Sequence, residues 1–198
     1  RGRAASLPAD KPYLRTAAWD IWSKRIPWLL LLMISATFTS MILSTFETAL
    51  AAQGALLLFI PMLMDTGGNS GGQASVTVIR GLSLGEVEPS DVLAVIWKET
   101  RVSLLCGVSL AVVCFGKVLL VDRMLMHNPE VTVTVALVVC LTMILTILVA
   151  KLIGCTLPLL AKKIGLDPAV CASPFITTIV DALSLLIYFA IASALLHL

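Results

Sequence analysis

Long apolar runs alternate with short polar segments along this chain. Four of the runs approach or reach the roughly 20 residues that a helix needs to cross about 30 Å of hydrocarbon, and one turns polar before that length. The runs are Pro27–Phe46, Ala49–Met64 with its polar continuation, Val102–Val121, Val131–Ala150 and Ala169–Leu196. The pattern predicts an all-α membrane protein with five transmembrane helices.

The segment before the first apolar run is predicted to be a cytosolic connector. Between residues 11 and 26 it mixes charged residues with apolar ones at helical spacing, which is typical of an amphipathic helix lying on a membrane surface. The apolar positions are Leu14, Ala18, Ile21, Trp22 and Ile26. A solvated link to further domains is the alternative. We therefore divide the chain into a connector, residues 1–26, and a five-helix transmembrane domain, residues 27–198.

The composition agrees with a membrane protein. Hydrophobic residues make up 59% of the 198 residues, charged residues 13%, and the mean hydropathy is +1.00, which is too apolar for a soluble domain of this size. The lipid bilayer is the expected partner, and no nucleic-acid partner is predicted. The five cysteines form no CxxC pair, so we interpret them as small packing residues rather than metal ligands or a disulfide.

The positions of Lys and Arg predict the orientation. Twelve of the 14 lie before the first span, between the second and third, or between the fourth and fifth, where Lys151, Lys162 and Lys163 are assigned. Only Lys117 and Arg123 lie toward the other side. Because cytoplasmic segments accumulate Lys and Arg, we expect a plasma-membrane protein with its N-terminus in the cytosol and its C-terminus outside.

One carboxylate is predicted inside a span. Asp181 lies near the middle of the last apolar run, where a charge costs roughly 3 kcal/mol or more unless it faces a partner or water. Pro174 on the same face is predicted to free a backbone carbonyl. The stripe at helical spacing predicts a water-lined ion path, and a structural hydrogen bond from protonated Asp181 is the alternative. Its other members are Thr177, Thr178, Ser184 and Tyr188.

A second polar group follows the short apolar run, in the stretch DTGGNSGGQASV. On a helix, three oxygen-bearing side chains fall on one side together with a glycine and a valine: Asp65, Asn69, Gln73, Gly72 and Val76. The glycines of this stretch, Gly68 and Gly72 among them, remove the side chains that would keep another helix at full distance. Helix packing alone is the alternative interpretation, but it does not account for Asn69 and Gln73.

The chemistry of these groups favours transport of a hard cation. Carboxylate, amide and hydroxyl oxygens suit Mg²⁺ or Ca²⁺ better than Zn²⁺ or Cu⁺. No nucleophile, base and orienting group come together, and His127 and His197 lie near membrane boundaries, so no enzyme is predicted. One intramembrane carboxylate per chain is too little for a dehydrated divalent ion. A homodimer would place two on a symmetry axis.

Two long motifs carry a family resemblance. The stretches IPMLMDTGGNSGGQASVTVIRGLSLGEV and PLLAKKIGLDPAVCASPFITTIVDALSLLIYFAIA closely resemble the second and fifth transmembrane helices of the MgtE-type magnesium channel family. The stretch KRIPWLLLLMISATFTSMI is similar to that family's first helix, so the resemblance extends from about Lys24 to the C-terminus. It implies a homodimer of five-helix subunits with a central pore that passes largely hydrated Mg²⁺.

The resemblance also implies roles for individual residues. Asp181 matches the family's central metal site, assisted by the main-chain carbonyl one turn earlier, at Thr177. Asp167 and Asn69 match further positions along the ion path. Ser184 stands where the family commonly has glycine, which is expected to narrow the pore or to add a hydroxyl to it. The family's cytosolic regulatory domains are not in this sequence, so gating through them is not inferred.

These observations predict a Mg²⁺-selective channel with Asp181 at its centre. Its metal-binding residues are expected to be Asp181, Thr177, Asn69, Asp167 and Asp65, and its pore-lining or close-packing residues Gly68, Gly72, Gln73, Pro174, Thr178 and Ser184. A coupled carrier or exchanger for Mg²⁺, Mn²⁺ or Co²⁺ is the alternative. A membrane anchor without transport would leave Asp181 unexplained.

Overall fold

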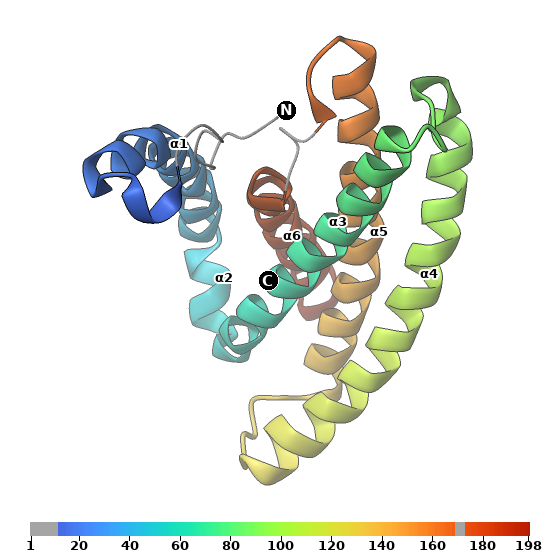
Figure 1. Ribbon diagram of the computed structural model, residues 1–198. Coiled ribbons are helices and arrows are strands. Elements are labelled where there is room, and N and C mark those ends of the chain that lie inside the picture. The colour runs from blue at the N-terminus through green and yellow to red at the C-terminus, as the bar shows by residue number, and fades with distance from the viewer. Residues whose placement is uncertain (1–11, 169–172) are drawn as a thin grey trace.

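The structure is a computed structural model that describes residues 12–168 and 173–198 (Figure 1). Within those ranges it is all-helical, so the all-α prediction is confirmed. Most elements are α-helices, while η1 to η3 are 3-10 helices and η4 is a π-helix. The order is η1 (Tyr13–Arg15), α1 (Ala18–Thr45), α2 (Glu47–Ala52), η2 (Gly54–Phe59), α3 (Ile60–Ser83), η3 (Pro89–Asp91), α4 (Val92–Lys117), η4 (Val118–Leu125), α5 (Val133–Lys163) and α6 (Ser173–Leu196).

Four helices of the described ranges are long and apolar enough to cross a membrane. They are Ala18–Thr45, Pro89–Leu125, Val133–Lys163 and Phe175–Leu196. Helix α3 has the length of a span, with 24 residues, but its polar residues keep it outside this group. The structure therefore identifies four of the five predicted spans.

The second predicted helix is wrong in its bounds. The apolar run Ala49–Met64 is divided among α2, η2 and the first turn of α3. The chain leaves helical geometry at Gln53, and Pro61 occupies the first turn of α3, where its missing N–H breaks no intrahelical bond. The long helix is thus built from the glycine-rich continuation of the run rather than from the apolar run itself.

Two predicted spans belong to helices that are longer than their apolar runs. Helix α1 begins at Ala18 and continues through Pro27, so the predicted connector and the first span share one helix in the described part. Helix α5 continues past Ala150 to Lys163. Lys151 therefore lies inside α5 with only 4% of its surface exposed, and its assignment to the segment between two spans is wrong. The apolar pattern resumes after Lys151, which explains why the helix continues.

Helices α3, α5 and α6 form the centre of the molecule and pack against one another (Figure 1). Helix α4 covers the outer side of α5, and α1 reaches the rest of the bundle chiefly through α6. The rings of Phe46 and Phe189 stack at this last contact, with centroids 4.7 Å apart. No residue of α1 is fully buried, and although Ile42 and Leu43 pack against the core, many of its other apolar side chains are exposed.

Glycines set the separation of the central helices. A Cβ atom added to Gly154 of α5 would lie 3.1 Å from the Cα atom of Gly71 in α3 and would overlap the Gly71 carbonyl. A Cβ atom on Gly71 would lie 2.7 Å from Ile176 Cγ2 in α6. The backbones of α3 and α5 therefore touch directly, with α6 against the same face of α3.

This contact predicts that Gly154→Ala destabilises the bundle. The added methyl must push α3 away from α5, and overpacking of this kind costs about 1–3 kcal/mol. Thermal unfolding of the purified protein in detergent should show a lower midpoint for Gly154→Ala. The control is Gly116→Ala in α4, where an added Cβ meets no atom within 4 Å. Gly116→Ala should leave the midpoint unchanged or raise it slightly, and equal midpoints for both variants would contradict the proposed contact.

Candidate functional site: a carboxylate cavity between two helices

A polar cavity of about 250 Å³ lies between α3 and α6. It contains two carboxylates, an amide and a hydroxyl, all from residues predicted to bind the ion. Its lining consists of Met64, Asp65, Gly68 and Asn69 from α3 with Thr177 and Asp181 from α6. The structure thus brings together residues that are 112 positions apart in the sequence, Asn69 and Asp181.

Helical spacing places the polar groups of the cavity. Asp65 and Asn69 are one turn apart on the exposed face of α3, and the Asn69 Nδ2 atom donates a hydrogen bond to Asp65 Oδ2 at 3.3 Å. Thr177 and Asp181 are one turn apart on α6 and are half-buried. The hydrogen bond from Asn69 to Asp65 directs the side-chain oxygen of Asn69 away from Asp65. Oxygen acceptors from both helices are therefore available to a cation.

Gly68 keeps the two walls of the cavity close. A Cβ atom at this position would lie 3.1 Å from the Cγ2 atom of Thr177, tighter than nearly all such contacts. Gly67, its neighbour, faces the interior instead, where an added Cβ would lie 2.9 Å from Val180 Cγ1. Two adjacent glycines therefore serve two faces: one packs α3 into the bundle, and the other shapes the cavity.

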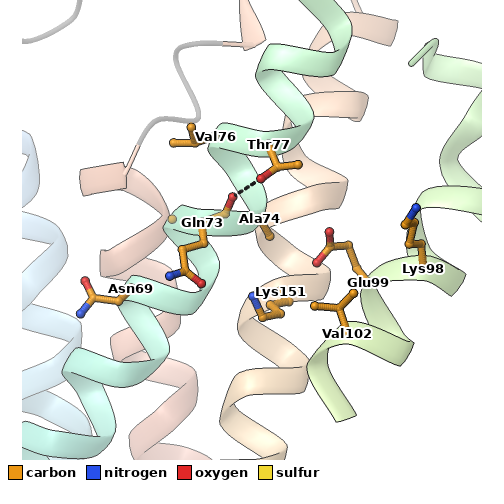
Figure 2. Close-up of a pocket in the computed structure, with 10 residues that line it drawn as sticks. Asn69, Gln73, Ala74, Val76, Thr77, Lys98, Glu99, Val102 and Lys151 are labelled. Atoms are coloured by element: carbon orange, nitrogen blue, oxygen red, sulfur yellow. Dashed lines mark hydrogen bonds between the residues drawn. The ribbon is translucent and has the colours of Figure 1, made fainter. Parts of the chain in front are cut away.

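A second cavity, of about 740 Å³, lies between α3, α4 and α5 (Figure 2). Asn69 lines both cavities, so they adjoin at this residue. Gln73 and Gly72 line only the second one, although they were expected on the same path as Asp65. The side chains of Gln73 and Asn69 are exposed, whereas Gly72 is buried.

Two other predicted residues, Asp167 and Thr178, lie outside the lining of these cavities. Asp167 lies in the segment between α5 and α6, and Thr178 lies half-buried on α6. Pro174 is the second residue of α6. Its side chain and residues 169–172, which precede α6, lie outside the described part of the chain, so the carbonyl that Pro174 is predicted to free stays a prediction.

Ser184 and Tyr188 continue the polar stripe of Asp181 into the protein core. Ser184 is 2% exposed and donates a hydrogen bond of 2.7 Å to the carbonyl oxygen of Val180. It packs against Gly67 rather than lining the cavity. Tyr188 is 1% exposed, and its hydroxyl donates a 2.7 Å hydrogen bond to the carbonyl oxygen of Leu56 in η2. Sequence spacing alone placed both residues on the ion path, because it does not show which neighbour faces them.

The sequence offered no sign of the contact between Tyr188 and Leu56, since 132 positions separate the two residues. The position of Lys151 within a helix differs from the prediction for another reason. In the sequence, a single lysine after an apolar run suggests the end of a span. The uninterrupted apolar pattern on both sides of it was the available signal.

The donor set suits a cation that keeps its water. In the part of the chain that the structure describes, no group of three or more His, Cys, Asp or Glu could enclose a metal ion. The cavity instead combines two carboxylates with neutral oxygens, a set that matches the preference of Mg²⁺ for oxygen ligands and retained water. Carboxylates between long apolar helices are typical of membrane proteins that transport ions.

Sequence comparison identifies the family within that class. The profile of the MgtE family, described as a divalent cation transporter, matches residues 60–191, which include α3 to α5 and most of α6. The chain belongs to the MgtE family of divalent cation transporters. The resemblance inferred from the two sequence motifs is thereby confirmed, and the family is one of transporters rather than enzymes.

Three curated relatives are named magnesium transporter MgtE. The relative from Thermus thermophilus is 34% identical over 194 residues, covering 98% of this chain and 41% of the relative. The relative from Bacillus subtilis is 36% identical over 182 residues, covering 92% of this chain and 39% of the relative. The relative from Enterococcus faecalis is 33% identical over 171 residues, covering 86% of this chain and 36% of the relative. The chain spans about two fifths of the length of these relatives.

The hydrogen bond from Tyr188 to Leu56 is predicted to stabilise the packing of α6 against η2. Tyr188→Phe should lower the free energy of unfolding by about 1–3 kcal/mol, because it leaves the Leu56 carbonyl without its donor in a buried site. Thermal unfolding in detergent measures the loss. The matched control is Tyr13→Phe, because Tyr13 is 62% exposed and should tolerate the change. A midpoint for Tyr188→Phe equal to that of Tyr13→Phe would show that the hydrogen bond contributes little.

Proposed function

We propose that this chain forms the membrane-spanning part of a Mg²⁺-selective channel. The observation that carries the proposal is the cavity in which α3 and α6 bring together Asp65, Asn69, Thr177 and Asp181. Membership of a divalent cation transporter family supports it, as do the three relatives named magnesium transporters. Asp181 is proposed as the central residue, because it contributes a carboxylate from the middle of an otherwise apolar helix.

Mg²⁺ is proposed to cross with much of its first hydration shell. Six waters occupy about 180 Å³ at about 30 Å³ each, which the cavity of about 250 Å³ has room for. Mg²⁺ loses water reluctantly, so carboxylate, amide and carbonyl oxygens that bind its waters select it at lower cost than direct ligands would. The main-chain carbonyl of Thr177, one turn before Asp181, is proposed as one of these acceptors.

The pore is proposed to form between two copies of the chain. Two carboxylates in one cavity balance a single divalent ion but surround it on one side only. A second copy related by a two-fold axis would supply the same groups from the opposite side. The exposed apolar side chains of α1 leave a large face available for lipid and for such a partner.

Helix α3 is proposed as the fifth span. Its 24 residues extend about 36 Å at 1.5 Å per residue, which is enough to cross about 30 Å of hydrocarbon. Its buried face consists of glycine, serine and small apolar residues packed on α5 and α6. Its polar face, with Asp65, Asn69 and Gln73, would then border the pore rather than lipid.

The proposal predicts that Asp181→Asn impairs Mg²⁺ transport. The substitution keeps the shape of the side chain and removes the charge that holds a hydrated divalent ion, so the Mg²⁺ concentration for half-maximal flux should rise at least about tenfold. The measurement is Mg²⁺ flux and monovalent leak in liposomes containing the purified protein. The control, Asp20→Asn, removes a carboxylate from the first turn of α1 and should behave as the parent protein does. An unchanged Mg²⁺ affinity in Asp181→Asn would place the central site elsewhere.

The same liposomes separate a channel from a coupled carrier. A divalent ion gains about 4.6 kcal/mol per 100 mV, twice the value for a single charge, so flux through a channel should follow voltage with no second ion present. Mg²⁺ flux that requires a gradient of Na⁺ or protons would support the coupled carrier instead.

The proposed orientation has the N-terminus in the cytosol and the C-terminus outside, in the plasma membrane. It retains its basis although Lys151 lies within α5, because most Lys and Arg residues still lie on the predicted cytosolic side. We expect a cysteine at Lys162, in a cysteine-free background, to react with an impermeant thiol reagent only from the cytosol. A cysteine at Met126, which is 69% exposed beyond η4, should react only from outside. Reversed labelling of the two sites would refute the orientation.

A further inference from the structure

Lys151 is a buried charge that the proposed ion site does not use. It lies within α5, which runs from Val133 to Lys163, and only 4% of its surface is exposed. A lysine at such a position in a membrane helix must face water, a polar cavity or an opposite charge, because an isolated ammonium in hydrocarbon is costly. The surroundings of Lys151 therefore define its role.

The Lys151 side chain points into the second cavity, the one of about 740 Å³ (Figure 2). Glu99 reaches the same space from α4, and Gln73 reaches it from α3. The other charged residue of the lining is Lys98, which is exposed. The lining thus carries two ammonium groups, those of Lys151 and the exposed Lys98, and one carboxylate, with an amide beside them.

The two opposite charges share this cavity without touching. Among the described residues, neither the Lys151 ammonium nor the Glu99 carboxylate forms an ion pair or a side-chain hydrogen bond. Lys151 as a residue is 4% exposed, but its ammonium is not among the buried atoms that lack a partner in the described part of the chain, and a cavity of this size has room for water between the charges. Lys151 therefore acts on the electrostatic potential of the whole cavity rather than on a single bonded partner.

The position of this cavity connects Lys151 to ion transport. Asn69 lines both this cavity and the one that contains Asp65 and Asp181, so an ion at the proposed site has the second cavity as its neighbour. Glu99, Gln73 and Asn69 are oxygen donors of the kind that divalent cations bind. Without Lys151, the exposed Lys98 would be the remaining cation of the described lining, and Glu99 would offer a divalent ion a carboxylate beside the proposed transport path.

We propose that Lys151 is a tethered cation that keeps divalent ions away from Glu99 and so confines them to the site at Asp181. This inference rests on the proposed function, because it assumes that the ion passes between Asp65 and Asp181. The Lys151 ammonium balances the charge of Glu99 through water and repels a second cation. An ammonium within about 6 Å of a divalent ion weakens its binding about tenfold even at the dielectric constant of bulk water. Lys151 is thus a specificity-determining residue rather than an ion ligand.

The experiment counts divalent ions bound to the purified full chain in detergent. Mn²⁺ serves as the probe, because it shares the octahedral oxygen preference of Mg²⁺ and its free form is measured by electron paramagnetic resonance. Lys151→Met keeps the length of the side chain and removes its charge. It should bind one additional Mn²⁺ per chain, at least about tenfold tighter than any binding at Glu99 in the parent protein. Lys151→Arg retains the charge and should match the parent protein.

Two further variants assign the additional ion. Lys151→Met combined with Glu99→Gln should lose it, because the carboxylate is gone. Glu99→Gln alone should bind as many Mn²⁺ ions as the parent protein, since Lys151 already keeps ions from Glu99. The single variant needs no change at Lys151, so it tests the inference even where Lys151→Met fails to fold.

Each outcome decides the matter. No additional ion in Lys151→Met, retention of that ion in the double variant, or loss of an ion in Glu99→Gln would each overturn the inference. Asp181→Asn, measured in parallel, tests the proposed function separately. A loss of Mn²⁺ binding there, combined with no gain in Lys151→Met, would remove the role of Lys151 and leave the proposed site at Asp181 supported.

Discussion

The direct backbone contact between α3 and α5 is the constraint on which the rest of the structure depends. Where Gly71 meets Gly154, no side chain separates the two helices, so α3 sinks into the groove between α5 and α6. One face of α3 is consumed by this packing. The opposite face of α3 carries polar side chains on successive turns, and it borders the two cavities. A helix that is unusually polar for a membrane protein is accommodated because its backbone, rather than its side chains, makes the close contact.

Several hydroxyls in the described helices bond to the backbone of their own helix, so they are not free to bind an ion. Thr142 and Ser184 donate to the carbonyl oxygen four residues earlier, at 2.7 Å each, and Thr77 does the same at 2.9 Å. Such bonds remove the polarity of a hydroxyl locally and say nothing about transport. The groups that stand apart are the carboxylates and amides facing the cavities, because their oxygens have capacity beyond their bonds within the helix.

The sequence predicted the presence of the helices better than it predicted their boundaries and their neighbours. Apolar runs of span length predicted four of the spans, and the carboxylate within the last run singled out Asp181. Both signals can be read from a short stretch of sequence. Hydropathy placed the second helix too early, because the residues that form α3 are polar on one face and glycine-rich on the other. The partners of Ser184, Tyr188 and Lys151 depend on contacts between distant segments, which periodicity in a single helix does not encode. Lys151 shows this most clearly. A single charge between two apolar runs suggests a loop between two spans, but Lys151 lies within α5 and lines a cavity.

The length of the helix formed by η3, α4 and η4 has a consequence for depth in the bilayer. Residues Pro89–Leu125 extend roughly 55 Å, and even a 40° tilt leaves about 42 Å along the membrane normal, more than the hydrocarbon thickness. The ends of a spanning helix of this length would extend beyond the hydrocarbon into the headgroup layers. Arg101 lies over the Trp97 ring near one end, and Lys117 pairs with Asp122 at 2.8 Å near the other, so interfacial groups oppose sliding in either direction. Because α4 packs against α5 at Gly107, this constraint on depth extends to α5 as well.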